Sequence, residues 1–433
     1  MNFVEAIIRK RDGGKLSRAQ LDRFALGAGA GELPPEQLAA MLMAICIRGM
    51  DADETRWLTE SMIRSGESWQ LGAARPDAVD KHSTGGVGDT VSLVFAPLLA
   101  AVGVPVAMMA GRGLGHSQGT VDKLDAVPGF RMDWSRDEAL GLIDRVGVAM
   151  LAQTKRIAQA DRVLYALRDV TGTVLSLPLI VASIMSKKLA MGAATLVLDV
   201  KCGRGAFRHT PAEALELARA LLELGRSMGV RCQAILTDMN QPLGPALGTA
   251  CEVREALAVL GGGGSRELRE VTMALARSAL ELAGRDAATA GVQLAQAIDD
   301  GSALAAWERL VEAHGGDPDP DLLARPRQVR EVAAPRSGFI TGVAAADLGW
   351  VAVDLGAGRR SRDEAIDHGA GLLIRARIGD RVEAGQPLGT ILIGERVVDA
   401  EAAERRVRDA FEIGEERVEA PPLILGSADT LAL

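Results

Sequence analysis

The chain of 433 residues contains few aromatic side chains and few cysteines. Aromatic residues make up 3% of it, with a single tyrosine, Tyr165, so aliphatic side chains and methionine must fill the core. None of the four cysteines is spaced as Cys-x-x-Cys, which excludes the common zinc and redox motifs. Four isolated thiols in a long chain are typical of a reduced, cytoplasmic protein. They are Cys46, Cys202, Cys232 and Cys251.

The sequence also lacks an excess of basic residues and a long uninterrupted apolar run. Lys and Arg number 49 against 57 Asp and Glu, a net charge of −8. Such a chain lacks the positive surface of a nucleic-acid-binding protein, although a few cations and backbone amides can still bind a small anion. The N-terminus shows no signal-peptide pattern. The most apolar segment, residues 91–110, is divided by Pro97, Gly103 and Pro105, which favours a buried helix and strand over a membrane span.

Length and composition indicate a globular protein of two or three domains. Apolar residues recur at helical spacing in residues 1–65 and again in 157–192, which predicts a small helical domain built from two segments. Residues 66–156 and 193–328 alternate glycine-rich turns with apolar runs, which predicts an α/β domain whose mixed sheet is covered by helices. Short strands dominate residues 329–433, so we expect a C-terminal α+β unit.

The densest group of polar residues is Asp80-Lys-His-Ser-Thr-Gly-Gly-Val-Gly-Asp-Thr-Val-Ser92. Its glycines let the backbone approach a ligand closely, and the helix expected at 90–102 would add its N-terminus, so the segment predicts an anion site. Lys81 would supply a charge, and Ser83, Thr84 and Ser92 would supply hydroxyl donors. No Gly-Lys-Ser/Thr closes the loop, so it is not a P-loop. The alternative is a solvated glycine-rich turn.

A second glycine-rich loop follows the strand expected at residues 105–109. It reads Ala110-Gly-Arg-Gly-Leu-Gly-His-Ser-Gln-Gly-Thr-Val-Asp-Lys123, and Thr120 could add another hydroxyl. Because both loops leave an apolar segment, we expect them to meet at the C-terminal edge of a sheet, where open α/β folds bind ligands. We expect its charged side chains to form ion pairs that brace the loop: Arg112, Asp122 and Lys123.

A third group of polar residues lies in the second helical segment. Ser183 and Lys187 are four residues apart and therefore share a helical face, and Arg168 follows Tyr165 in the preceding helix. These donors, facing a pocket, could bind the carbonyl oxygens of a neutral ring. The alternative for Lys187 is exposure to solvent, which is what we expect for Lys188.

These three motifs closely resemble the thymidine and pyrimidine-nucleoside phosphorylases. The resemblance continues through residues 198–207, 236–244 and 367–371 and so covers essentially the whole chain. It implies reversible phosphorolysis of a pyrimidine nucleoside: thymidine and phosphate would give thymine and 2-deoxyribose 1-phosphate. It also implies a homodimer with the ligands in the cleft between the helical and α/β domains. Phosphate would be the co-substrate, and we expect no organic cofactor and no nucleic-acid or membrane partner.

The resemblance also assigns roles to single residues. It implies that four residues contact phosphate: Lys81, Ser83, Ser92 and Thr120. It implies that the pyrimidine is bound by His82, Tyr165, Arg168, Ser183 and Lys187. Phosphate is already an anion, so no covalent nucleophile is needed; Arg168 and Lys187 would stabilise charge on the departing ring, and His82 would donate a hydrogen bond or a proton. Some members hold a potassium ion, at positions that correspond to Gly88, Thr90, Leu243, Ala246 and Glu255.

Three positions depart from the family pattern. Ala110 replaces a serine of the phosphate site, and Gln118 stands where a glycine is typical. Met108 stands where members that accept both sugars often have lysine, whereas thymidine-preferring members often have methionine. We therefore expect Met108 to contact substrate and to favour 2′-deoxynucleosides. The alternatives are that Met108 packs in the core and that the enzyme accepts pyrimidine nucleosides broadly.

Two rival functions fit the sequence less well. A phosphoribosyltransferase of related fold would need magnesium ligands, for which Asp89 and Asp122 are unconvincing. The turn at residues 379–385 resembles one in biotinyl and lipoyl carriers, but no lysine follows Lys201 to be modified. We reject the carrier role and expect a barrel-sandwich-like fold for this unit.

Overall fold

The computed structural model describes residues 2–113, 115–154, 156–361 and 364–431, and the chain divides into two compact units. The helical unit comprises Met1–Asp80, Gln153–Leu196 and Arg219–Cys232, and the α/β unit comprises the remaining residues. The sequence patterns suggested only two segments for the helical unit, residues 1–65 and 157–192. The third segment contacts this unit at Gly225, which packs closely against α10 (Leu177–Met191): a Cβ on Gly225 would lie 3.2 Å from Cε of Met185.

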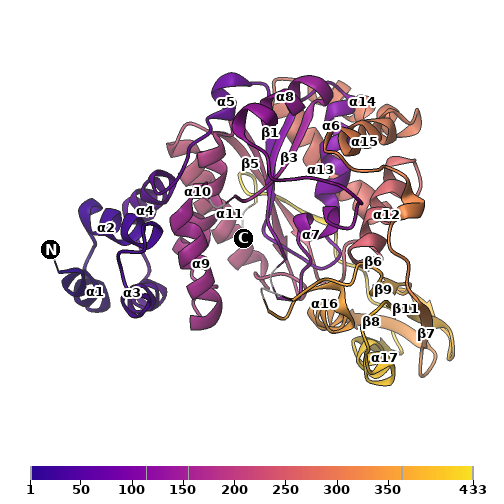
Figure 1. Ribbon diagram of the computed structural model, residues 1–433. Helices are drawn as coiled ribbons and strands as arrows, with labels where there is room; N and C mark the ends of the chain where they lie inside the picture. Colours follow the sequence, from indigo (N-terminus) through magenta and orange to yellow (C-terminus); the bar gives the residue numbers. More distant parts are fainter. Residues whose placement is uncertain (1, 114, 155, 362–363, 432–433) are drawn as a thin grey trace. The chain divides into compact units, whose positions relative to one another are not determined.

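Two groups of helices distant in sequence pack together in the helical unit (Figure 1). α9 packs against α2 and α3, and α10 packs against α4. Ser17 and Asp51 cap α2 and α4, each in a capping box, which satisfies backbone donors of the first turn. The helices are α1 (Phe3–Arg11), α2 (Arg18–Gly29), α3 (Pro35–Arg48), α4 (Ala52–Arg64), α5 (Leu71–Ala74), α9 (Gln159–Thr171) and α10 (Leu177–Met191).

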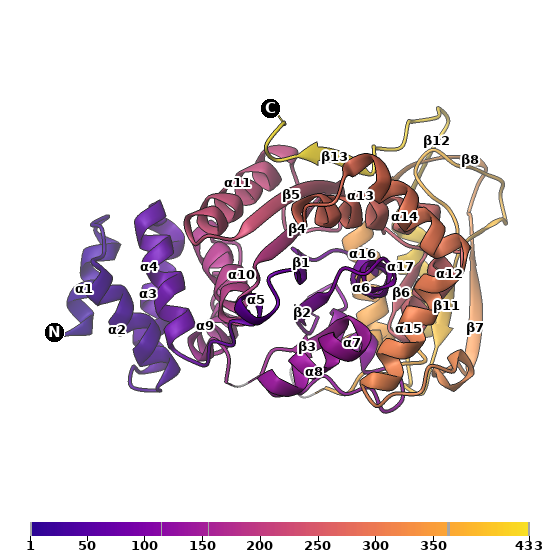
Figure 2. The ribbon, with the colours of Figure 1, turned by 90° about the horizontal axis from the view of Figure 1, so that it is seen from above.

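The α/β unit is built on a six-stranded mixed sheet with strand order β13-β5-β4-β1-β2-β3 (Figure 2). β2 and β3 are parallel, whereas β13 joins β5 antiparallel. β4 is buried along its whole length, as expected for a strand whose two faces are both covered. The strands are β1 (Val79–Ser83), β2 (Val106–Ala110), β3 (Val148–Ala152), β4 (Thr195–Cys202), β5 (Arg231–Asp238) and β13 (Ile424–Ser427).

Helix α6 explains the most apolar stretch of the sequence. It spans Val91–Ala101 and contacts β2 and β3 as well as α12, α13 and α15, so it is buried on all sides. In the described part of the chain, no helix is long and apolar enough to cross a membrane. The other helices along this stretch of chain are α7 (Thr120–Leu124), α8 (Arg136–Val146), α11 (Pro211–Ser227), α12 (Ala250–Leu260), α13 (Arg266–Leu282), α14 (Ala287–Asp299) and α15 (Ser302–Ala313).

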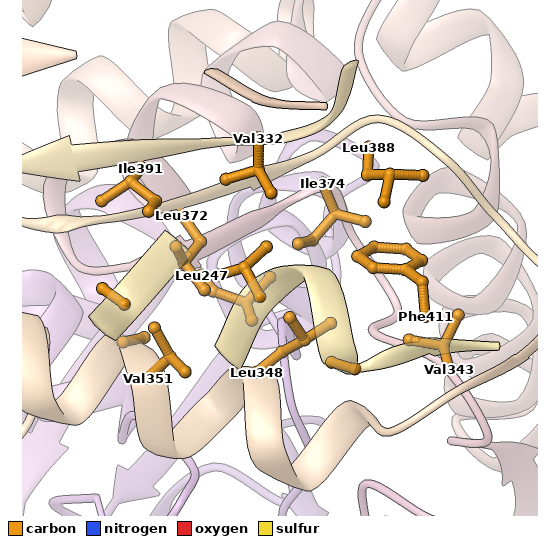
Figure 3. Close-up of a cluster of buried hydrophobic side chains, with 14 of the residues drawn as sticks. Leu247, Val332, Val343, Leu348, Val351, Leu372, Ile374, Leu388, Ile391 and Phe411 are labelled. Carbon is orange, nitrogen blue, oxygen red and sulfur yellow. The ribbon is translucent and has the colours of Figure 1, made fainter. Parts of the chain in front are cut away.

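The C-terminal region contains a three-stranded sheet, β10-β8-β12, and a four-stranded sheet, β6-β9-β11-β7. β6 (Ala246–Gly248) comes from outside residues 329–433, so the region is not built from the last segment of the chain alone. Figure 3 shows Leu247 of β6 packed among residues of both sheets and of α16. The remaining elements are β7 (Gln328–Ala333), β8 (Gly338–Val343), α16 (Ala345–Ala352), β9 (Gly371–Ile374), β10 (Arg381–Val382), β11 (Pro387–Ile393), α17 (Ala400–Asp409), β12 (Phe411–Gly414), the 3₁₀-helix η1 (Pro320–Leu322) and the π-helix η2 (Val353–Ala357).

A buried histidine makes the stability of the α/β unit depend on pH. Nε2 of His314 accepts from the Met150 amide at 3.1 Å, and Nδ1 lies 2.8 Å from the Leu310 carbonyl. Burial lowers the pKa of His314 to about 4. The unfolded chain therefore takes up a proton that the folded chain excludes, so this stability is complete above pH 6.5 and is lost as pH falls toward 4.

We expect His314→Gln to reduce the pH dependence of unfolding. Between about pH 7.5 and about pH 5, the wild type should lose about 2 kcal/mol more stability than the variant, because glutamine does not titrate. Urea unfolding of both proteins at the two pH values measures this difference. Equal losses would show that His314 is not the group responsible.

Candidate active site

The glycine-rich segment after β1 forms a tight turn that ends at the N-terminus of α6. Gly85 and Gly88 have φ values of +94° and +66°, in the left-handed region that favours glycine. A Cβ on Gly88 would lie 3.0 Å from the carbonyl oxygen of Gly244, so the backbones approach closely there. Thr90 precedes the first helical residue, Val91. The segment therefore presents backbone amides at a helix start, as an anion site requires.

The structure brings together several of the predicted phosphate residues. Nζ of the buried Lys81 lies 3.4 Å from Oγ of Ser92. The Ser83 hydroxyl donates to Asp89, and its oxygen accepts from the Gly85 amide at 3.2 Å. These contacts hold a lysine and two hydroxyls around the turn.

The second loop meets the first, as expected from the two strand ends. A Cβ on Gly85 would lie 3.7 Å from Oγ of Ser117, and β1 and β2 are neighbours in the sheet. The half-buried Thr120 begins α7 in this loop. Ala110 ends β2, and Leu114 lies outside the described residues.

The charged residues of the second loop brace it. Oδ2 of Asp122 accepts from the Gly113 amide at 2.6 Å, and Oδ1 accepts from Arg112 at 3.0 Å. Lys123 is buried, where its ammonium pairs with Glu252 at 2.5 Å and donates to the backbone oxygen of Asp89 at 2.6 Å. The predicted ion pairs within the loop are confirmed. Asp122 uses both carboxylate oxygens to hold the loop, and not to bind a metal.

The predicted base-binding residues of the helical unit form a second cluster. Nζ of Lys187 donates to Asp161 at 2.6 Å and to Ser183 at 2.9 Å, and its side chain is only 19% exposed. The solvated alternative for Lys187 is therefore wrong. Two of its three ammonium hydrogens are used by these residues, which leaves one for a ligand.

Lys188 is not exposed, contrary to our expectation. It is 2% exposed and donates to Asp80 at 2.8 Å. Adjacent positions in α10 point in different directions, and both directions are filled with protein here because the helix is buried on most of its surface. The apolar residues on either side of the two lysines favoured burial, but the expectation that Lys188 is exposed did not take them into account.

Arg168 and Tyr165 lie beside this cluster on α9. The Arg168 guanidinium is buried and donates to three backbone carbonyls, those of Thr173, Val174 and Leu179. Arg168 therefore orders the turn between α9 and α10. Three of its five N–H groups make these bonds, and the other two can donate to a ligand. The guanidinium carbon and Nζ of Lys187 lie 5.5 Å and 5.9 Å from the centre of the Tyr165 ring. Burial raises the pKa of Tyr165 to about 12, so its hydroxyl stays protonated.

Asp161 is a site residue that the sequence reasoning missed. It is buried and holds the ammonium of Lys187. A signal was available, because Asp161, Tyr165 and Arg168 follow one another by four and three residues and share one face of α9.

His82 and Met108 occupy different settings. His82 is half-buried in β1, next to Lys81. Met108 is 1% exposed in β2 and pairs in parallel register with Met150. This burial favours core packing, the alternative left open for Met108, over direct contact with a sugar.

The five residues implied for potassium lie close together. The Gly88 carbonyl accepts from the Gly244 amide at 3.2 Å, and the Ala246 amide donates to Glu255 at 3.2 Å. Oε1 of Glu255 is buried without a hydrogen-bond partner, and burial with the nearby Glu252 raises the pKa of Glu255 to about 8. A carboxylate in this setting would gain from a cation. Across the described ranges, no cluster of three or more His, Cys, Asp or Glu side chains could hold a metal.

Comparison with known proteins covers the whole chain. Residues 75–304 match the α/β domain of the glycosyl transferase family, residues 4–66 match its helical bundle domain, and residues 339–414 match the pyrimidine nucleoside phosphorylase C-terminal domain. The pyrimidine-nucleoside phosphorylases of Geobacillus stearothermophilus and Bacillus subtilis are each 42% identical to this chain, over 98% of it and 99% of their own length.

A solved structure supports the fold independently. Anthranilate phosphoribosyltransferase from Thermus thermophilus superposes with a TM-score of 0.57, covering 71% of this chain and 99% of its own. At 19% identity the likeness concerns the fold alone. The full-length relatives decide the family: the chain belongs to the pyrimidine-nucleoside phosphorylases, a family of pentosyltransferase enzymes.

Proposed function

We propose that this protein catalyses the reversible phosphorolysis of pyrimidine nucleosides and prefers thymidine, giving thymine and 2-deoxyribose 1-phosphate. The observation that carries the reaction class is the buried Lys81 ammonium beside Ser92 at the start of α6. A buried cation, hydroxyls and helix amides are the donors that a phosphate ion needs. The 42% identity to named pyrimidine-nucleoside phosphorylases supports the substrate class.

The two clusters divide the chemistry between them. Lys81, Ser83, Ser92 and Thr120 bind phosphate in the α/β unit, and phosphate attacks C1′ of the nucleoside. The bond to the base breaks, and negative charge develops on the oxygens of the pyrimidine. The remaining ammonium hydrogen of Lys187 and the guanidinium of Arg168 stabilise that charge. His82 donates a hydrogen bond or a proton to the departing base.

We also infer that a potassium ion binds near Glu255. Gly88, Thr90, Leu243 and Ala246 would offer oxygens, and the Glu255 carboxylate would offer charge. Bound there, the ion would hold the turn before α6 against the segment before α12. The Leu243 carbonyl also accepts from Arg377 at 3.3 Å, so one lone pair of that oxygen is already used.

Assembly as a homodimer is part of the same proposal. Large apolar side chains are exposed on α1 and α3, two helices that contact each other. A second copy of the chain would remove this apolar surface from water. The exposed residues are Val4, Ile8, Met43 and Ile47.

The four free thiols support a reducing compartment such as the cytoplasm.

One activity panel tests the reaction and the sugar preference together. We expect release of thymine from thymidine only when phosphate is present, and release of uracil from deoxyuridine about tenfold to a hundredfold more efficiently than from uridine. Deoxyuridine and uridine share a base, so their kcat/KM ratio isolates the sugar. Met108 is buried in the core, so the preference rests on the absence of a lysine at this position, which removes a donor for the sugar hydroxyls, and not on contact between Met108 and the sugar.

The phosphate dependence and the sugar preference are contradicted by different results. Equal thymine release in phosphate-free buffer would make the protein a hydrolase. A kcat/KM ratio near one would leave phosphorolysis intact and identify a broad pyrimidine-nucleoside phosphorylase.

A further inference from the structure

Four charged side chains form a buried chain beneath the phosphate turn. Nζ of Lys201 lies 2.8 Å from Oδ2 of Asp199 and 3.8 Å from Oδ1 of Asp89. Nζ of Lys81 lies 3.6 Å from the same Asp199 oxygen. The side chains of Lys81, Asp199 and Lys201 are fully buried. Two ammoniums and two carboxylates therefore alternate, and their charges sum to zero.

Strand geometry explains why these groups meet. Asp199 and Lys201 are two residues apart on β4, as are Lys81 and Ser83 on β1, so each pair shares a face of the sheet. β4 and β1 are neighbours. Thr237 of the next strand, β5, donates to Oδ1 of Asp199 at 2.7 Å, which fixes the carboxylate and turns Oδ2 toward the two lysines.

Both ends of the chain of charges reach residues of the phosphate site. At one end, Lys81 donates to Ser92. At the other, Asp89 accepts the hydroxyl of Ser83. Lys201 lies between them and touches neither serine in the described contacts. We propose that Lys201 is a positioning residue for phosphate, which acts through Asp199 and Asp89 on Lys81 and Ser83; the proposal rests on the phosphate site of the proposed function.

The unequal distances around Asp199 give the mechanism. Lys201 makes the close pair at 2.8 Å, and Lys81 stays at 3.6 Å, so most of the Asp199 charge is neutralised by Lys201. Lys81 therefore keeps Ser92 at 3.4 Å and Asp199 at 3.6 Å as longer contacts, and we expect its charge to act on an incoming anion as well. Burial disfavours the charged form of Lys201, but Asp199 and Asp89 outweigh it and raise the pKa of Lys201, so the positive charge persists.

Removing the Lys201 charge should weaken phosphate binding selectively. Without it, Asp199 pairs with Lys81 alone, and the cluster becomes net negative where a dianion must bind. We expect Lys201→Met to raise KM for phosphate about tenfold to a hundredfold, and to leave KM for the nucleoside within about twofold. The double variant Asp199→Asn/Lys201→Met restores neutrality, and its phosphate KM should return to within about fivefold of the wild type.

A matched control distinguishes an effect on phosphate binding from the general destabilisation caused by breaking any buried ion pair. Lys10 of α1 is buried and pairs with Glu54 at 2.8 Å inside the helical unit. Lys10→Met should lower thermal stability by a similar amount but leave KM for phosphate unchanged. If Lys201→Met does not fold, the double variant and Lys201→Arg carry the test, since neither leaves an uncompensated buried carboxylate at this pair.

The outcomes distinguish the two proposals. A folded Lys201→Met enzyme with wild-type KM for phosphate overturns the positioning role, as does a double variant no better than the single one. An equal rise in both KM values, or the same phosphate effect in Lys10→Met, shows a merely structural role. A wild-type enzyme that needs no phosphate overturns the proposed function instead.

Discussion

Replacing Lys187 with alanine should lower kcat about a hundredfold or more while the protein stays folded. The ammonium is held by Asp161 and Ser183, and one N–H remains for a carbonyl oxygen of the base. Its charge acts more strongly as the base departs with negative charge, so the loss falls on the transition state and costs about 3 kcal/mol. Steady-state kinetics with saturating phosphate measures this loss.

The control for Lys187 lies on the neighbouring helix. Arg162 is an exposed cation of α9, and Arg162→Ala should leave kcat unchanged. A rise in the nucleoside KM alone, with kcat preserved in Lys187→Ala, would mean that the lysine binds the base but does not stabilise its departure. Near-normal kinetics would contradict the assignment altogether.

Lys81→Met should lower kcat/KM for phosphate about a hundredfold, the second large effect. Lys81 is the charged member of the predicted phosphate set, and methionine keeps most of its length but removes every donor. We expect the variant to fold, because Lys201 still lies 2.8 Å from Asp199 and neutralises it.

Two measurements check the Lys81 prediction. The melting temperature in the presence of phosphate should rise in the wild type but not in Lys81→Met, since ligand that binds only the native state stabilises it. The KM for nucleoside should stay near the wild-type value. A normal phosphate response in the folded variant would place the anion elsewhere.

The sequence predicted the glycine-rich turns well because their chemistry is local. Glycines, a lysine and hydroxyls within a few residues require no knowledge of the rest of the chain, and the turn from Gly85 to Gly88 is formed as expected. The apolar run of 91–110 likewise divided at Gly103 and Pro105, between α6 and β2.

Partners across strands and helices could not be predicted in the same way. Asp199 and Lys201 stand in an otherwise apolar strand, but their link to Lys81 depends on β4 lying beside β1. The burial of Lys188 depends on Asp80, which is 108 residues away. Ion pairs between residues so far apart in the sequence depend on strand order and helix packing, which cannot be predicted from a single sequence.

The pairing of β13 with β5 has a consequence for biosynthesis. β13 pairs with β5 beside Thr237, the residue that fixes Asp199. The sheet edge next to the buried charges therefore stays open until residues 424–427 have left the ribosome. A nascent chain that carries every other strand still exposes an unpaired β5 edge. The central sheet is thus completed only after β13 has emerged, and a truncation before Ile424 would remove a structural strand rather than a dispensable tail.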